Sequence, residues 1–150
     1  MLLEVEKIAS AYKGRNDMLI KVLREVQPLT NNTLTPEVAK TIANAMEIPL
    51  TQVYDTATFY ALFSTEPRGK HIIRLCRSAS CHLNKAKELL QQIEKKLNIK
   101  VGQTTTDGLF TLETCECLGL CDVSPSMIID DDVYGNVTIN KFKKIIGKYR

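Results

Sequence analysis

The sequence predicts a mixed fold of two parts, a helical bundle over residues 1–66 followed by an α/β domain over residues 67–150. Apolar residues recur at helical spacing through the first part, whereas from about residue 70 strand-like and helical patterns alternate. All five cysteines lie in the second part, which marks it as the part that carries the chemistry. At 150 residues the chain is long enough for about one domain with an extension.

Four helices are expected in the first part, separated by Gly14, Pro28 and Pro49. The third has a clear start at Thr35-Pro36-Glu37, because Thr caps free amides, Pro suits the first helical position and Glu favours the positive helix end. The apolar positions that define the four helices are Leu3, Ile8 and Tyr12; Leu19, Val22, Leu23 and Val26; Val38, Ile42, Ala45 and Met46; and Val53, Tyr54, Phe59 and Phe63.

The second part is expected to run β-α-β-β-β-α. The predicted strands are residues 71–76, residues 110–113 and a hairpin of residues 127–130 and 134–138 around an acidic turn. A sheet of this size must be covered largely on one face by the two helices. The apolar stripes of these helices are Leu83, Ala86, Leu89, Leu90, Ile93 and Leu97, then Phe142, Ile145, Ile146 and Tyr149.

Composition argues against several classes of protein. Lys and Arg total 20 against 17 acidic residues, a net charge of +3, and no basic run could follow a phosphate backbone, so nucleic acid is not an expected partner. No apolar run approaches the ~20 residues that span a bilayer. The opening MLLEVEKIAS lacks the features of a signal peptide, which favours a cytoplasmic location. In a reducing compartment, clustered cysteines more often bind metal or act in redox chemistry than form disulfides.

The cysteines form two pairs, with Cys76 and Cys81 in CRSASC and Cys117 and Cys121 in CLGLC. Each pair falls where a predicted strand passes into a loop, so the two loops are expected to bring four thiolates together. Four thiolates are the ligand set of a 2Fe–2S cluster. Structural zinc uses the same set, and the spacing does not exclude it. A thioredoxin-type dithiol would need C-x-x-C, which the sequence lacks.

These pairs, 35 residues apart and followed by DVSPSMIIDDDVYGNVT, resemble the thioredoxin-like 2Fe–2S ferredoxin family. The resemblance extends upstream through LTPEVAKTIANAMEIPLTQVYDTATFYALF and so covers nearly the whole chain. It implies a thioredoxin-like fold for the second part. The family includes the small flavoprotein-module subunit of NADH:quinone oxidoreductase (respiratory complex I). It also includes units of NAD-linked hydrogenases, electron-bifurcating hydrogenases and NAD-dependent formate dehydrogenases.

The resemblance implies a set of ligands as well. Carried over position by position, the ligands of one 2Fe–2S cluster fall on Cys76, Cys81, Cys117 and Cys121. Cys115 has no ligand role in that pattern and is expected to be a small residue at a strand end. Members often carry Gly-Thr between the first two cysteines, where this chain has Arg77-Ser78-Ala79-Ser80. The ligands stay intact, but the local charge and hydrogen bonding differ.

The sequence contains no G-x-G-x-x-G loop, P-loop or nucleophile–base pair, so a non-catalytic redox subunit is expected. The resemblance implies a flavin- and NAD(H)-binding partner subunit with FMN beside the cluster, and through it further iron–sulfur, hydrogenase or dehydrogenase subunits. The helical part is expected to dock this partner. Hydrogenase, formate dehydrogenase and complex I all stay open as hosts, with a bacterial or archaeal complex favoured.

Two other functions stay open, a free ferredoxin-like carrier and a zinc-stabilised interaction domain. The helical extension argues against the free carrier, because carriage needs only the cluster domain. Among other residues, His82 is interpreted as a helix-start residue and His71 as a partly exposed polar residue. The acidic residues 130–132 are interpreted as a solvated turn. The aromatic stripe of residues 54–63 fits either core packing or partner docking.

Overall fold

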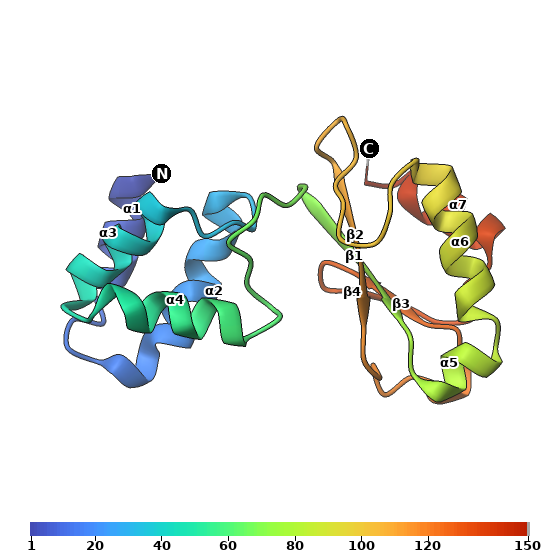
Figure 1. Cartoon of the computed structure of the whole chain (residues 1–150), viewed down its shortest axis with the longest axis horizontal. Coiled ribbons are helices and arrows are strands. Elements are labelled where there is room, and N and C mark those ends of the chain that lie inside the picture. The colour runs from blue at the N-terminus through green and yellow to red at the C-terminus, as the bar shows by residue number, and fades with distance from the viewer. Residues whose placement is uncertain (150) are drawn as a thin grey trace. The chain divides into compact units, whose positions relative to one another are not determined.

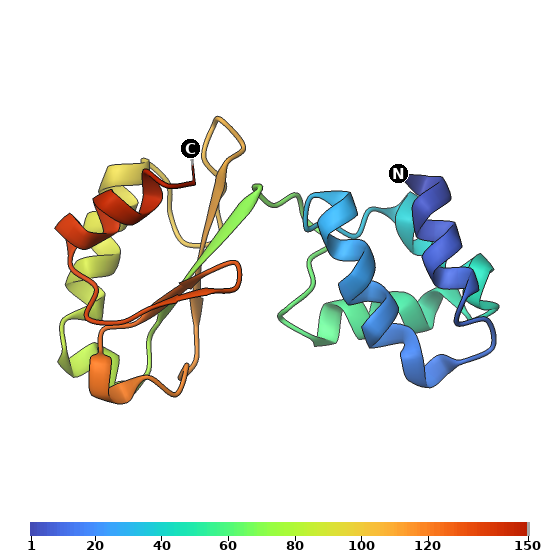
Figure 2. The same ribbon diagram turned by 180° about the vertical axis from the view of Figure 1, so that it is seen from behind.

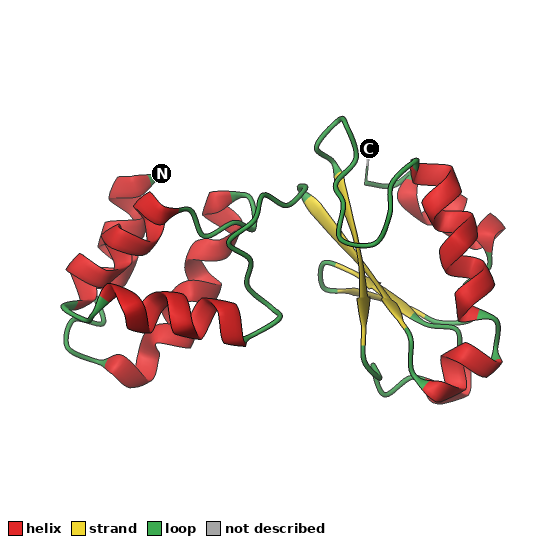
Figure 3. Cartoon of the chain, viewed as in Figure 1, coloured by secondary structure: helices red, strands yellow, loops and turns green. Residues whose placement is uncertain are grey.

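The computed structural model describes residues 1–149 and divides into two compact units, one over residues 1–67 and the other beginning at Arg68. Each unit has its own hydrophobic core. Within the described residues, the first unit is built from helices and all strands belong to the second (Figures 1 and 3). The sequence pattern therefore identified the class of each unit correctly.

The first unit packs four α-helices around one core: α1 (Leu2–Ser10), α2 (Leu19–Val26), α3 (Pro36–Met46) and α4 (Leu50–Phe59). Short 3-10 turns at Asn16–Met18 and Gln27–Thr30 flank α2. Helix α3 lies centrally in the packing, against both α1 and α4. Its Ile42 and Met46 are fully buried, because the apolar positions recur on one face of the helix.

Helix α3 begins as the sequence predicts. Thr35 is the N-cap, and its Oγ1 accepts a hydrogen bond of 3.3 Å from the backbone N–H of Val38. The helix ends where Glu47 takes a left-handed conformation with φ of 56°.

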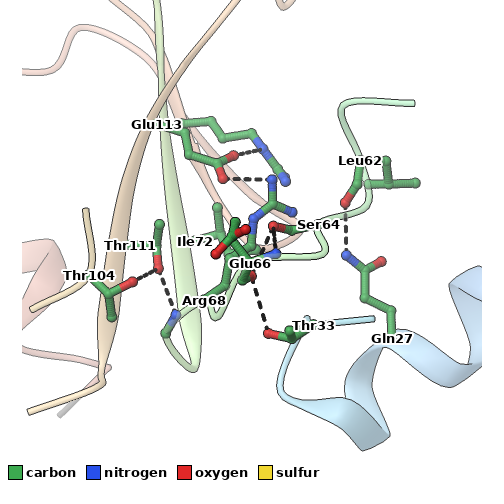
Figure 4. Close-up of polar contacts among 12 residues, drawn as sticks. Gln27, Thr33, Leu62, Ser64, Glu66, Arg68, Ile72, Thr104, Thr111 and Glu113 are labelled. Atoms are coloured by element: carbon green, nitrogen blue, oxygen red, sulfur yellow. Dashed lines mark hydrogen bonds and ion pairs between the residues drawn. The ribbon is translucent and has the colours of Figure 1, made fainter. Parts of the chain in front are cut away.

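Helix α4 is shorter than expected. The prediction extended this helix through Phe63, but it ends at Phe59 because Tyr60 is extended, with φ of −90° and ψ of 116°. Phe63 still reaches the core at 7% exposure, although it is not helical. The chain after α4 is held to its own unit where Gln27 Nε2 donates a 2.9 Å hydrogen bond to the carbonyl of Leu62 (Figure 4).

The second unit contains a four-stranded sheet of order β2-β1-β3-β4. Strand β1 (His71–Cys76) pairs in parallel with β2 (Phe110–Cys115) and antiparallel with β3 (Met127–Ile129), which forms a hairpin with β4 (Asp132–Tyr134). The parallel register places Cys76 beside Cys115. The hairpin around an acidic turn is confirmed, but its second strand covers residues 132–134 rather than 134–138.

The long helices α6 (Ala86–Leu97) and α7 (Ile139–Ile146) lie on the same side of the sheet in both views (Figures 1 and 2). Their apolar faces pack on alternate strand residues such as Ile73, Leu75 and Leu112. Because side chains alternate along a strand, the opposite face carries a second set. That set is Ile72, Arg74 and Cys76 on β1 and Thr111, Glu113 and Cys115 on β2.

The expected single helix over residues 83–97 is two helices in the structure. The short α5 (Ala79–Leu83) and α6 are separated because Lys85 adopts a left-handed conformation with φ of 65°. Cys81 therefore lies within the short α5. None of the helices in residues 1–149 is long and apolar enough to cross a membrane.

Candidate metal centre

The cysteines gather at one edge of the sheet of the second unit. Strands β1 and β2 are parallel and end at Cys76 and Cys115, so the loops that follow them start side by side. The first loop leads into α5, which carries Cys81. The second contains Cys117 and reaches the short 3-10 turn η3 (Cys121–Val123).

The first pair of cysteines is buried. Cys76 and Cys81 are 1% and 2% exposed and lie in a small apolar cluster with Ala86, against which Cys115 and Leu118 pack. The hydroxyl of Ser126 lies 3.5 Å from Cys81 Sγ and is itself buried. The Ser126 carbonyl also accepts a hydrogen bond from the Cys76 N–H. Ser126, which directly precedes β3, thus contacts both members of this pair.

The second pair is exposed and close together. The Sγ atoms of Cys117 and Cys121 lie 3.5 Å apart. Between them, the Gly119 N–H points at Cys117 Sγ over 3.4 Å. Gly119 has φ of 76°, a conformation that glycine adopts without a steric cost from Cβ. The loop therefore brings two sulfur atoms and one amide donor to the same place.

Polar contacts tie the two cysteine loops together. Ser80 Oγ donates to the carbonyl of Cys121 over 3.2 Å, and Asn84 Nδ2 donates to Ser124 Oγ over 2.7 Å. The Arg77 N–H donates to the carbonyl of Cys115, and the Arg77 side chain forms an exposed ion pair with Glu116. These contacts hold both loops at the same edge.

The thiols influence one another's ionisation. Burial of Cys76 favours the neutral thiol, but hydrogen bonds from the Ser78 N–H, the Cys81 thiol and the Leu118 N–H outweigh it and lower the pKa of Cys76. The pKa of Cys121 is raised, first by its hydrogen bond with Cys117 and further by the charges of Cys117, Cys81 and Cys76. All four thiols are thus within electrostatic reach, and a bound cation would favour their thiolate forms.

Cys115 has different surroundings from these four. Burial and then the negative charge of Cys76 raise the pKa of the Cys115 thiol to about 11, although Arg74 opposes them. Cys115 therefore stays protonated at neutral pH, which suits a small residue at a strand end.

The residues fit a binuclear cluster. No group of three or more His, Cys, Asp or Glu side chains within residues 1–149 is placed around a single metal position. A 2Fe–2S cluster has two irons, and each takes two protein ligands. The two pairs match this requirement in number and in chemistry. Cys76 and Cys81 would hold one iron, and Cys117 and Cys121 the other.

The other residues singled out in the sequence are not part of the proposed ligand set. His82 is exposed on α5. His71 is partly exposed, as predicted, and its Nδ1 lies 2.6 Å from Asp130 Oδ2. Asp130 also accepts a hydrogen bond from the Ile72 N–H. Asp132 accepts a hydrogen bond from Tyr149. Residues 130–132 are all exposed, which confirms the predicted solvated turn, and two of the three carboxylates also bond within the unit.

Sequence reasoning missed Ser126 and the contacts of Ser80 and Asn84. Ser126 lies 45 residues after Cys81, within the DVSPSMIIDDDVYGNVT stretch, but no local pattern indicates that its hydroxyl reaches a cysteine. Only the antiparallel pairing of β3 with β1 brings it to the cysteines.

A thioredoxin-like α/β unit that gathers two cysteine pairs at one sheet edge defines a class of small iron–sulfur proteins. The chain belongs to the thioredoxin-like [2Fe-2S] ferredoxin family, whose family model matches residues 5–150. It is 36% identical over 147 residues to one of the NADH-quinone oxidoreductase subunits of Rhizobium meliloti (strain 1021), covering 98% of this chain and 87% of that one.

A second relative comes from a different kind of enzyme. The chain is 34% identical over 146 residues to the NADP-reducing hydrogenase subunit HndA of Solidesulfovibrio fructosivorans, covering 97% of this chain and 85% of that one. Among solved structures, an NAD+-reducing [NiFe]-hydrogenase in the air-oxidised state superposes with a TM-score of 0.77 at 20% identity. The match covers 88% of this chain and 22% of that chain, and it supports the fold assignment.

Proposed function

We propose that the chain is the electron-transfer subunit of an NAD(P)-linked oxidoreductase and that Cys76, Cys81, Cys117 and Cys121 hold its single 2Fe–2S cluster. The observation that carries the proposal is the meeting of two cysteine pairs at one sheet edge, one buried and one exposed. Membership of the [2Fe-2S] family supports the identity of the cluster.

When bound, the cluster supplies one-electron chemistry. The residues of the chain hold it and set its surroundings. The buried pair, Cys76 and Cys81, shields one side from water. The exposed pair, Cys117 and Cys121, leaves the other side open to a neighbouring redox group. The Gly119 N–H donates a hydrogen bond to Cys117 Sγ, and the Ser126 hydroxyl, 3.5 Å from Cys81 Sγ, would donate to a thiolate there. Both donors would stabilise negative charge on sulfur.

The partner we propose is a flavin- and NAD(H)-binding subunit whose FMN lies beside the cluster. The chain contains no dinucleotide-binding loop of its own, so hydride chemistry must occur elsewhere. Two of its relatives are named as subunits of an NADH-quinone oxidoreductase and of an NADP-reducing hydrogenase, which supports assembly into a larger enzyme of either kind. A formate dehydrogenase is a third candidate host.

The helical unit is proposed to dock this partner. Phe59 and Tyr60 form an edge-to-face pair with ring centroids 5.0 Å apart at the end of α4, and Phe59 is 81% exposed. Exposed aromatic pairs of this kind are typical anchors of protein interfaces. This feature favours a subunit over a free ferredoxin-like carrier.

The test is to measure iron and acid-labile sulfide in the anaerobically purified chain and to record EPR spectra after dithionite reduction. Two irons and two sulfides per chain with an S = 1/2 signal support the cluster. Zinc without sulfide would instead indicate a zinc-stabilised interaction domain. Co-purification with a flavoprotein then separates the subunit from a free carrier.

A further inference from the structure

Three charged side chains meet beside the candidate cluster site. Glu113 Oε1 lies 2.7 Å from Arg68 Nη2, and Glu113 Oε2 lies 3.0 Å from Arg74 Nε, so one carboxylate is shared by two guanidinium groups (Figure 4). We call Arg68, Arg74 and Glu113 the charge triad. Their side chains are only 10%, 19% and 19% exposed, respectively.

The charge triad is not neutral. Two guanidinium groups and one carboxylate leave a net positive charge, since Arg stays protonated at any ordinary pH. Nη2 of Arg74 is also buried without a hydrogen-bond partner among the described residues. Because the three side chains are largely buried, their charges are weakly screened and act over a longer distance than surface charges.

The register of the sheet places this charge near the cysteines. Arg74 and Glu113 are neighbours across β1 and β2, and Cys76 and Cys115 are neighbours two residues further along. Because side chains alternate, Arg74 and Cys76 lie on the same face of β1. Arg74 and Cys76, the first proposed ligand, are therefore consecutive side chains on one face of β1, so the charge triad lies next to the ligand on that face.

We propose that the charge triad raises the reduction potential of the cluster, with Arg74 and Glu113 acting in opposite directions. The inference rests on the proposed function, because it requires the cluster at Cys76. On reduction the centre accepts one electron from a donor such as reduced flavin. No bond forms or breaks, and the centre gains one negative charge. A nearby net positive charge stabilises the more negative reduced state, which raises the potential.

A second ion pair provides an internal control. Arg77 directly follows Cys76, and its Nη2 pairs with Glu116, but these side chains are 66% and 75% exposed. Water and salt screen such a pair strongly. If burial determines the effect, charges in this pair should influence the potential much less than charges in the charge triad, although Arg77 and Glu116 are closer in sequence to the proposed ligands.

The experiment is a dye-mediated redox titration of the full-length chain with its cluster bound, followed by the EPR signal of the reduced state. We expect Arg74→Gln to lower the potential, because it removes a positive charge, and Glu113→Gln to raise it, because it removes a negative charge. Arg74→Lys retains the charge and should leave the potential close to the wild-type value. Arg77→Gln and Glu116→Gln should each produce a smaller shift than the matching variant in the charge triad.

The opposite signs distinguish electrostatic action from loosened structure. Shifts of Arg74→Gln and Glu113→Gln in the same direction, or equal shifts in the Arg77 and Glu116 controls, would overturn the inference. If Arg74→Gln does not retain a cluster, the potentials of Glu113→Gln and Arg74→Lys test the proposal instead. An unchanged or lowered potential in Glu113→Gln would contradict it. Absence of any cluster in the wild-type chain would instead refute the proposed function.

Discussion

Cys115 and Cys117 are two residues apart in the sequence but lie in different environments. Cys115 ends a strand, packs beside Cys76 and has its pKa raised to about 11, chiefly by burial. Cys117 is exposed, accepts a hydrogen bond from the Gly119 N–H and lies 3.5 Å from a second thiol. The second environment suits the ligand role that we propose for Cys117, whereas Cys115 in the first behaves as a small apolar side chain.

Serine substitutions at Cys117 and Cys115 test which of the two thiols binds the cluster. Cys117→Ser should abolish or strongly weaken the visible absorption and EPR signal of the cluster, because it removes one of four thiolates. Cys115→Ser should leave both spectra nearly unchanged. Visible absorption and iron content of the two variants, purified side by side without oxygen, provide the measurement. An intact spectrum in the first variant or a lost one in the second would show that the ligand assignment is wrong.

Ser126 is a second single residue that we expect to affect the cluster. Its buried hydroxyl lies 3.5 Å from Cys81 Sγ. A hydroxyl that donates to a sulfur ligand stabilises the reduced, more negative state. We expect Ser126→Ala to lower the reduction potential, by about 60 mV if the bond contributes a tenfold preference for the reduced state. Redox titration measures the shift, and Ser124→Ala is the control, because the Ser124 hydroxyl contacts Ser80 and Asn84 instead. An equal shift in both variants would rule out a specific role for Ser126.

At the scale of elements, helix α3 depends on its cap. The Thr35 side chain satisfies the Val38 N–H, an amide with no partner inside the helix. Thr41, in the middle of the same helix, bonds to the Glu37 carbonyl of the preceding turn. The same residue type therefore has two different effects on one helix.

Thr35→Ala should reduce the free energy of unfolding by about 1 kcal/mol. Thr41→Ala should be neutral or slightly stabilising, because alanine has the higher helix propensity. Urea unfolding followed by far-ultraviolet circular dichroism gives both values. A loss in Thr41→Ala as large as that in Thr35→Ala would contradict the capping argument.

At the scale of the whole molecule, the chain combines two units with separate cores, and each holds its own end of the connecting segment. In the first unit Thr33 Oγ1 donates to the Glu66 carbonyl, and in the second the Gly69 N–H donates to Thr111 Oγ1 over 2.6 Å (Figure 4). The proposed cluster belongs to one unit and the exposed aromatic pair to the other. We therefore propose that electron transfer and partner docking belong to different units.

This separation predicts that docking is lost without loss of the cluster. Phe59→Ala should weaken binding to the proposed flavoprotein partner about tenfold while leaving the EPR spectrum and thermal stability unchanged, since Phe59 packs little within its own unit. Leu3→Ala is the matched control, because Leu3 is 82% exposed on α1. Calorimetry on the two variants measures the affinity for the partner and shows whether Phe59 contributes to it. Equal affinities would remove Phe59 from the docking surface.

The sequence by itself determined the class of each unit and most of the element positions. These features depend on local periodicity and caps, such as the apolar face of α3 and the Thr35 start, which neighbouring residues specify. It also predicted that the two cysteine pairs follow strands, because a strand end is marked by local composition. Two helix boundaries were predicted wrongly, because the backbone conformation of one residue ends the helix in each case. These residues are Tyr60 after α4 and Lys85 between α5 and α6.

Only the tertiary structure decided which distant residues surround the thiols. The pairing of β1 with β2 and β3 brings Ser126 to Cys81 and places the charge triad on the face that carries Cys76. It also decided that one cysteine pair is buried and the other exposed. These properties depend on strand order and register, which join residues far apart in the chain, such as Arg74 and Glu113. No local pattern encodes them, because the free energy that selects the register comes from burial of the whole sheet face.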